Sequence, residues 1–380
     1  MRVAVISEMQ AGSHRAHAIN VVKTAGGFHR LGHRVTILCR APQDPEPDLS
    51  AMFGEPGVEW SFAPERADFG RWAADAADHL SADMVYARNF EAPLRTSLAG
   101  IPTVLETHAH IGDPNPAIDL CMQATRRPGH PLAAVITINR RLREHFIRRG
   151  ADPERVHVIP DGVDVELFSP PAVFPPAPWL GDADDRPRAV YAGHLYDYKG
   201  IPTVLDAAAV LPDWVFELVG GAPEDIARWS EAIGRRTQKN VRLRGHVPHA
   251  EVPRWLWRAG ALLLPPSGRD PSAAWTSPVK LGEYLASGPP IVASDIPGLR
   301  DWVDGSVVRW VTPDDPAALA GAIAEVAKES ARDSAARRAA ASRLADQYSY
   351  RRRAQRILHA AGAGGGAFSA LVGARDGSES

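Results

Sequence analysis

Short apolar segments alternate with helical segments along nearly the whole chain, and this alternation restricts the fold more than any other feature. In the first half, the segments that predict strands cover residues 3–6, 35–38, 84–86, 103–105, 134–138 and 156–159, with a helix over 17–31. Short strands rich in β-branched residues, separated by helical periods, are typical of βαβ units and of a parallel sheet buried on both faces. We therefore predict a Rossmann-like first half.

The alternation stops at residues 166–187 and then begins again. Prolines crowd this stretch: Pro170, Pro171, Pro175, Pro176, Pro178 and Pro187. Because proline continues neither a helix nor an interior strand, we predict an extended connector here. Strands are predicted again at 189–192, 215–219, 241–243, 261–264, 290–293 and 307–311. The expected fold class is α/β, with two doubly wound parallel-sheet domains facing a cleft at the carboxyl ends of both sheets.

Composition excludes several classes of protein. The 380 residues include 43 Lys plus Arg and 45 Asp plus Glu, and this balance argues against a chain that wraps nucleic acid. Cys39 and Cys121 lie far apart without metal-ligand spacing, so we expect no disulfide scaffold and no zinc site. Neither a secretory leader nor an apolar run of about 20 residues is evident, and we expect a cytoplasmic protein.

Two motifs in the second half carry the most chemical information. In the first, residues 191–200, a buried strand runs into a glycine turn with Gly193 and Lys199; in the second, residues 277–288, Glu283 begins an alanine-containing helix. A glycine turn and a lysine suit a diphosphate, and a carboxylate suits a ribose diol. Alone, Lys199 is equally well explained as a solvated turn lysine, and Glu283 as a helix-start residue. Together they predict a sugar-nucleotide site.

The chain resembles the retaining GT-B-fold glycosyltransferases of family 4, from the first strand to about residue 360. The matching segments are 32–36, Ile159-Pro160-Asp161-Gly162-Val163-Asp164 with Phe168, 193–200, Gly245-His246-Val247-Pro248, 283–294, and Tyr348-Ser349-Tyr350 with Arg353. Their order and spacing carry the resemblance. It implies transfer of a sugar from a nucleoside-diphosphate sugar to an acceptor hydroxyl, with retention of anomeric configuration.

The resemblance also implies which residues act. The implied donor-binding residues are Gly12, Gly193, His194, Lys199, Gly245, Val247, Thr276, Ser277, Lys280 and Glu283. The implied catalytic residues are His108, Lys199 and Glu283, and the implied acceptor-binding residues are His108, His110 and Trp275. Lys199 would contact the diphosphate and Glu283 the ribose. The alternative for His108 is a strand-end histidine that is hydrogen-bonded to backbone. His110 competes with His108 for the same role.

The domain organisation follows from the same resemblance. We expect an acceptor-side domain over 1–165, the connector over 166–187, a nucleotide-sugar domain over 188–345, a helix over 346–361 that returns to the first domain, and a disordered tail over 362–380. The nucleotide would be UDP or GDP, and no other cofactor is expected. The acceptor would be a small molecule, a glycan or a lipid-linked intermediate.

Two departures from the family pattern concern the donor. Where the family often has an arginine after the glycine of the first motif, this chain has His194, so phosphate binding would depend on Lys199, helped by Lys280. Where a second glutamate is common, eight residues before Glu283, this chain has Trp275. Thr276 and Ser277 would take over near the helix start. Asp270 could supply the missing carboxylate, although an ordinary Asp-Pro turn explains it better.

The expected mechanism stabilises the leaving nucleoside diphosphate by Lys199 and loop N–H groups, without a metal. The acidic pairs at 184–185 and 314–315 lie in a connector and a turn, which suits neither for metal binding. No general base is named, because the leaving phosphate would accept the proton of the acceptor.

Arginines crowd residues 140–149, around an apolar stripe of Ile138, Leu142 and Phe146 that we expect to pack into the first domain. A solvated face explains these arginines best. An anionic acceptor or peripheral contact with a membrane is a weaker explanation.

Three other functions compete with the glycosyltransferase interpretation. A nicotinamide-dependent oxidoreductase also has Rossmann domains, but residues 11–16 lack the Gly-x-Gly-x-x-Gly pattern after the first strand. A non-catalytic sugar-nucleotide-binding protein is harder to separate, because of Trp275. A synthase that joins an activated sugar to a sugar phosphate is a third alternative, and an acceptor screen would separate it.

Overall fold

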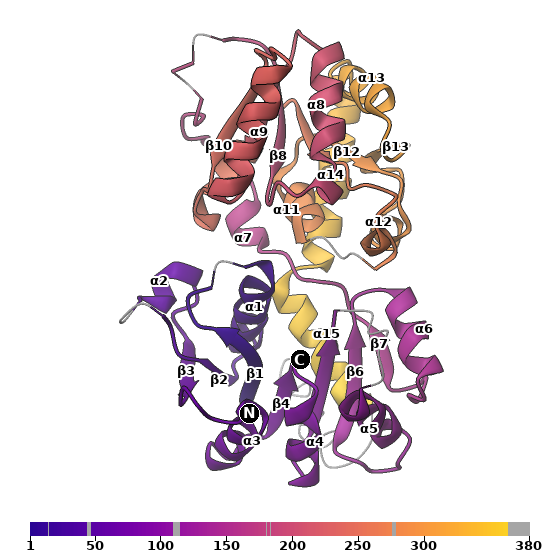
Figure 1. The fold of residues 1–380 in the computed structure, drawn as a ribbon. Coiled ribbons are helices and arrows are strands. Elements are labelled where there is room, and N and C mark those ends of the chain that lie inside the picture. Colours follow the sequence, from indigo (N-terminus) through magenta and orange to yellow (C-terminus); the bar gives the residue numbers. More distant parts are fainter. Residues whose placement is uncertain are drawn as a thin grey trace. The chain divides into compact units, whose positions relative to one another are not determined.

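The computed structural model describes residues 1–13, 15–43, 47–108, 115–179, 181–182, 184–275 and 279–363 (Figure 1). The chain divides into two compact units. The first comprises Met1–Gly162 and the segment from Tyr348 onward, and the second comprises Val163–Gln347. Each unit is built around its own parallel sheet with helices, so the prediction of two Rossmann-like domains is confirmed.

The first domain has a seven-stranded parallel sheet in the order β3-β2-β1-β4-β5-β6-β7. Its strands are β1 (Arg2–Gln10), β2 (Arg34–Arg40), β3 (Val58–Ala63), β4 (Met84–Ala87), β5 (Thr103–Thr107), β6 (Leu132–Thr137) and β7 (Val156–Val158). Its helices are α1 (Ala16–Arg30), α2 (Leu49–Phe53), α3 (Phe69–His79), α4 (Glu91–Leu98), α5 (Pro116–Thr125), α6 (Arg140–Arg148) and α15 (Tyr350–Ala363). The strand order reverses between β1 and β4, which is where ligands bind in open α/β sheets.

The second domain repeats this plan with six parallel strands in the order β10-β9-β8-β11-β12-β13. The strands are β8 (Arg188–Ala192), β9 (Val215–Val219), β10 (Val241–Gly245), β11 (Ala261–Leu264), β12 (Ile291–Ser294) and β13 (Val308–Val311). The α-helices are α7 (Val165–Phe168), α8 (Ile201–Val210), α9 (Pro223–Arg235), α10 (Val252–Leu256), α11 (Val279–Ser287), α12 (Pro297–Arg300), α13 (Pro316–Val326) and α14 (Ala331–Gln347). Short 3₁₀ helices are η1 (Asp197–Lys199), η2 (His249–Glu251) and η3 (Pro271–Ala274). Here the order reverses between β8 and β11.

Helix α15 belongs to the first domain, as predicted for the returning helix, and packs along α1 (Figure 1). The two helices approach closely because Gly27 has no side chain: a Cβ there would lie 2.4 Å from the carbonyl oxygen of Tyr350. Tyr350 and Arg353 are both buried. The last helix is therefore part of the core of the first domain.

Other expectations can be compared with the structure. The segment predicted as a connector begins within α7, whose Phe168 carbonyl accepts a hydrogen bond from the indole of Trp257, 2.7 Å away.

Leu142 and Phe146 are fully buried, which confirms that the apolar stripe of α6 faces inward. Cys39 and Cys121 are buried free thiols, and burial raises the pKa of each to about 12. Helix α15 continues to Ala363; residues 364–380 of the predicted tail lie outside the described residues. None of the described helices has the length and apolar character needed to cross a membrane.

Candidate active site

The glycine turn predicted to bind phosphate lies at the point where the second sheet reverses its strand order. Gly193 follows β8 directly and has φ +139°, and Gly200 has φ +83°, a region that favours glycine. A Cβ at Gly200 would lie 1.8 Å from the carbonyl oxygen of Pro265, which follows β11. The turn is thus held against the carboxyl ends of both strands at the reversal, where the prediction places the donor.

Lys280 reaches this turn from the first turn of α11. A Cβ at Gly193 would lie 2.1 Å from the Nζ of Lys280, so the absence of a side chain there makes room for the ammonium group. The Nζ also donates a hydrogen bond to the hydroxyl of Tyr191 at 2.8 Å and lies 4.2 Å from the centre of its ring. Tyr191 in turn donates to the carbonyl of His194 at 2.6 Å. A chain of hydrogen bonds therefore joins α11 to the glycine turn.

Two lysines influence each other electrostatically here, and neither has an acidic partner in contact within the described residues. Neither Lys199 nor Lys280 forms an ion pair within the described parts of the chain. Burial, followed by the charge of Lys199 and opposed by Glu283, lowers the pKa of Lys280 to about 7. Burial also lowers the pKa of Lys199, opposed by Asp270. This positive charge is poorly compensated, which favours an anionic ligand.

Glu283 lies one turn beyond Lys280 on α11 and is buried. Its Oε1 lies 3.0 Å from the Nε2 of His249, whose ring packs on Phe168 with centroids 5.3 Å apart. The carboxylate that is predicted to hold the ribose is therefore oriented by a histidine of η2. Sequence reasoning missed His249, although it follows the quoted segment Gly245 to Pro248 directly.

In the first domain, His108 lies just beyond β5 between two carboxylates. Its Nε2 is 2.5 Å from Oε1 of Glu106, and its Nδ1 is 3.6 Å from Oδ1 of Asp161. Asp161 also accepts a hydrogen bond from the amide of Asn20 at 2.5 Å. The ring of His108 therefore has a carboxylate on each side, Glu106 within hydrogen-bonding distance and Asp161 slightly farther away.

Arg353 of α15 completes this group from the far end of the chain. Its side chain is fully buried and donates to Glu106, to the carbonyl of Pro160 at 2.9 Å, to Thr24 at 3.0 Å and to Tyr86 at 3.3 Å. Burial alone would raise the pKa of Glu106, but Arg353, His108 and Arg88 outweigh it and hold that pKa well below its usual range. Glu106 is therefore ionised and already neutralised by the protein.

Glu106, His108 and Asp161 could also hold a metal ion on distance alone, since one ligand atom of each lies within 4.8 Å of the others. Sequence reasoning did not foresee this group. Arg353 occupies the second oxygen of Glu106, and the Nε of Arg88 lies 3.8 Å from the first. A divalent cation would meet two guanidinium groups there, so the charges fit the protein's own network better than they fit a metal.

The remaining predicted residues are more scattered. Gly12, with φ +79°, lines a cavity of about 570 Å³ beyond the carboxyl end of β1. Gly245, with φ +71°, accepts a hydrogen bond from the N–H of Gly220, and Val247 is half-buried. The exposed ring of His194 stacks on Tyr196, with centroids 5.0 Å apart.

Around the second motif, Trp275 is half-buried, and its backbone N–H donates a hydrogen bond to the Ser272 carbonyl. Asp270 accepts a hydrogen bond from the N–H of Ser272 at 2.8 Å, as expected of an Asp-Pro turn. His110, Thr276 and Ser277 lie outside the described residues.

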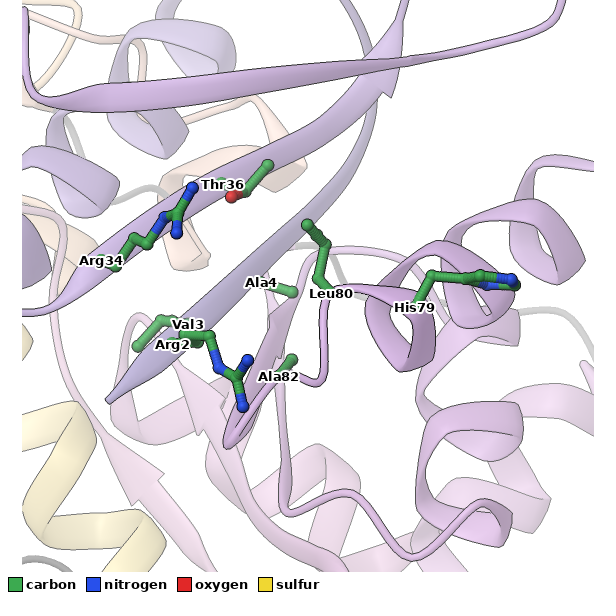
Figure 2. Close-up of a pocket in the computed structure, with 8 residues that line it drawn as sticks. All are labelled: Arg2, Val3, Ala4, Arg34, Thr36, His79, Leu80 and Ala82. Carbon is green, nitrogen blue, oxygen red and sulfur yellow. The ribbon is translucent and has the colours of Figure 1, made fainter.

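A second, smaller cavity has a different location. Figure 2 shows its lining, which comes from the amino ends of β1 and β2, the last residue of α3 and the segment that follows α3. It measures about 210 Å³ and is lined by Arg2, Val3, Ala4, Arg34, Thr36, His79, Leu80 and Ala82. Ligands of open α/β sheets bind at the carboxyl ends of the strands, so this cavity is not part of the candidate site.

Solved structures identify the class of fold. Anabaena HepE in complex with UDP superposes with a TM-score of 0.72 at 18% identity, covering 94% of this chain and 99% of that one. A glycosyltransferase from Rickettsia africae gives a TM-score of 0.73 at 14% identity, covering 95% and 97%. The lipopolysaccharide glycosyltransferase WaaG gives 0.64 at 15% identity, covering 93% and 98%. The chain therefore has the GT-B fold.

Sequence families narrow this class. Residues 19–167 match the family "Glycosyltransferase Family 4", and residues 186–329 match the family "Glycosyl transferases group 1". The first match lies almost entirely in the first domain and the second match in the second domain, so each domain is similar to a family of glycosyltransferases.

Curated relatives match over part of their length. D-inositol 3-phosphate glycosyltransferase 1 of Catenulispora acidiphila is 32% identical over 204 residues, covering 50% of this chain and 47% of the relative. The amylovoran biosynthesis glycosyltransferase AmsK of Erwinia amylovora is 24% identical over 194 residues, covering 50% and 46%. The matched stretch thus spans about half the length of these relatives.

Proposed function

We propose that this chain is a retaining glycosyltransferase that moves a sugar from a nucleoside-diphosphate sugar to an acceptor hydroxyl. The observation that carries the proposal is that two lysines lack acidic partners near the strand-order reversal of the second sheet: Lys280, which lies beside Gly193, and Lys199, whose charge acts on Lys280. A diphosphate supplies the negative charge that this place lacks. The UDP and UDP-glucose bound to HepE support a uridine nucleotide, with GDP as the alternative.

The donor would be held at three places in the second domain. Lys199 and Lys280 bind the diphosphate, and Glu283, oriented by His249, accepts hydrogen bonds from the ribose. Gly245 and Val247 line the base pocket, while Thr276 and Ser277 contact the donor near the start of α11. We also assign Gly12 and His194 to donor binding, with His194 in the place where the family often has an arginine.

Transfer would proceed by departure of the nucleoside diphosphate. Negative charge then develops on the leaving phosphate, and the two lysines stabilise it. These cations serve where a metal otherwise would, so we propose a metal-independent reaction. The acceptor oxygen bonds to the anomeric carbon on the face from which the phosphate departs, and the leaving phosphate takes the proton of the acceptor hydroxyl. Because attack and departure share one face, the anomeric configuration is retained without a dedicated base.

The acceptor side is assigned to the first domain, where His108 lines the reaction centre. Its ring is fixed by Glu106 and Asp161, which suits a group that must meet the reacting sugar in one orientation. His110 and Trp275 would contact the acceptor. A small polyol, a glycan or a lipid-linked intermediate all offer the required hydroxyl.

The first test is thermal unfolding of the chain with UDP, GDP, ADP, their sugar conjugates and NAD(P). A ligand at about 100 times its dissociation constant stabilises by roughly 2.7 kcal/mol, which a melting curve resolves. We expect one nucleoside diphosphate and its sugar to raise the midpoint, and NAD(P) to have no effect. A response to NAD(P) alone would overturn the proposal.

The donor so identified is then offered to an acceptor panel that includes polyols, sugar phosphates and glycans. Release of nucleotide that depends on an acceptor separates an enzyme from a non-catalytic binding protein. NMR of the product gives the anomeric configuration, and a chelator tests metal independence. An inverted product, or activity lost with chelator and restored by a divalent cation, would contradict the mechanism.

A further inference from the structure

Lys280 occupies an unusual position for a lysine. Its ammonium group lies against the Gly193 backbone and over the Tyr191 ring, and within the described residues its one hydrogen bond goes to the Tyr191 hydroxyl. A charged ammonium carries three N–H donors, so this arrangement leaves much of its hydrogen-bonding capacity unused. The Tyr191 hydroxyl can accept from Lys280 because its own proton is donated to His194.

The groups that face Lys280 do not favour its charge overall. Lys199, from η1, repels it, and the buried phenol of Tyr191, from β8, is neutral because burial raises its pKa well above the usual value. Glu283, on the same helix, attracts it, but the carboxylate is shared with His249. Burial lowers the pKa of Lys199, and the charge of Asp270 opposes this effect. Burial and the neighbouring cation therefore outweigh the single carboxylate.

We propose, on the basis of the donor site described above, that Lys280 takes up a proton when the diphosphate of the donor binds, so that donor affinity falls as the pH rises above neutrality. Without ligand, burial and Lys199 leave Lys280 divided between its charged and neutral forms near pH 7, since its pKa is about 7. A bound diphosphate stabilises the ammonium form. The proton comes from solvent and the free electron pair of the neutral amine accepts it; no covalent bond to the ligand forms.

The sign of the effect follows from linkage. The liganded site binds more protons than the empty site at pH values above about 7, so the dissociation constant rises with pH there. One proton taken up corresponds to a limit of about tenfold per pH unit. Below about pH 6, Lys280 is already charged and the dissociation constant becomes independent of this group.

Titration calorimetry with UDP-glucose and GDP-mannose tests this directly. Sugar nucleotides are diphosphate diesters, so they lack the phosphate ionisation near pH 6 that a terminal phosphate has. Measuring the binding heat at about pH 8 in buffers of different ionisation heat gives the number of protons taken up. We expect nearly one proton at about pH 8 and nearly none at about pH 5.5.

Variants separate this inference from the donor site itself. Lys280→Arg keeps a permanent charge, so we expect binding without proton uptake and with little dependence on pH. The matched Lys199→Arg variant should keep the proton uptake, because Lys280 is unchanged. Gly193→Ala should weaken binding, because its Cβ would meet Lys280, whereas Gly234→Ala, with nothing within 4 Å, should not.

Binding by the unchanged chain without proton uptake, or uptake that persists in Lys280→Arg, would overturn the inference and leave the donor site standing. Absence of binding by either sugar nucleotide in a folded chain would overturn the donor site and the inference together.

Discussion

The two domains hold their charged residues in opposite ways. In the first domain, Glu106, His108, Asp161 and Arg353 neutralise one another in a buried network drawn from β5, α15 and the segment after β7. In the second, Lys199 and Lys280 lie together without an acid in contact. The first domain thus holds the His108 side chain in place, while the second keeps an excess of positive charge that an anionic ligand would neutralise.

The largest effect is expected from breaking the neutralised network. Arg353→Met leaves Glu106 buried without its main partner, which typically costs about 3–5 kcal/mol. Urea unfolding should show the loss as a lower midpoint for the first domain. Arg351→Met, an exposed change on the same helix, should be nearly neutral, and equal midpoints for the two variants would show that the network is not structural.

Removing a charge from the second domain should affect binding rather than folding. Lys199→Ala deletes one charge-assisted contact to the diphosphate, worth about 1.5–3 kcal/mol, so we expect about 10–100-fold weaker sugar-nucleotide binding. Its melting midpoint should not fall, because no ion pair is lost and the repulsion of Lys280 is relieved. Lys239→Ala, at an exposed position, is the control for calorimetry. Unchanged affinity in Lys199→Ala would remove this lysine from the donor site.

A smaller effect is expected at the ribose. Glu283→Gln keeps the size of the side chain and an oxygen for His249 but loses the charge, so we expect about tenfold weaker binding. The ratio of the dissociation constants for 2′-deoxy-UDP and UDP should become smaller in the same variant. The exposed Glu251→Gln serves as control. Weaker binding with unchanged discrimination would place Glu283 away from the ribose.

The smallest expected change is a gain in stability. In the folded chain the pKa of Lys280 is about 7 instead of 10.5. Its charge therefore lowers the free energy of unfolding by the full amount below about pH 7. This destabilisation disappears by about pH 10.5. Loss of the hydrogen bond to Tyr191 offsets part of this gain, so Lys280→Met should raise the melting midpoint by only a few degrees near neutral pH, and the rise should shrink as the pH increases. The same variant should lose donor affinity. A lower melting midpoint at every pH would contradict the claim that the positive charge of Lys280 is poorly compensated.

The sequence predicts the fold well because β-branched strands and helical periods recur twice, and the predicted strand segments at 189–192 and 215–219 coincide with β8 and β9. It also marks Lys199 and Glu283, which stand in recognisable local motifs. Contacts between distant positions are different. Arg353 reaches Glu106 across 247 positions, and Lys280 reaches Tyr191 across 89. Neither spacing has a local pattern, so the neutralised network and the role of Gly193 in admitting Lys280 emerge only from tertiary packing.

His249 shows a further limit of local patterns. Histidines at positions 246 and 249 stand in the same short segment, and nothing in the sequence selects the one that contacts Glu283. In the structure, His249 lies at the start of η2 and packs on the ring of Phe168, which positions it against Glu283. Glu106 directly follows the apolar pair Val104 and Leu105 in β5, and this glutamate was the signal that could have drawn attention to the first-domain network.

The most direct test is protection of the two lysines from trace acylation by a bound nucleoside diphosphate. Peptide mass spectrometry would follow labelling of Lys199 and Lys280, with the exposed Lys239 and Lys328 as internal references. We expect saturating UDP or GDP to slow labelling of Lys199 and Lys280 about tenfold or more, with the reference lysines unchanged. A nucleotide that stabilises the chain yet leaves both lysines as reactive as before would contradict a donor site built on this pair.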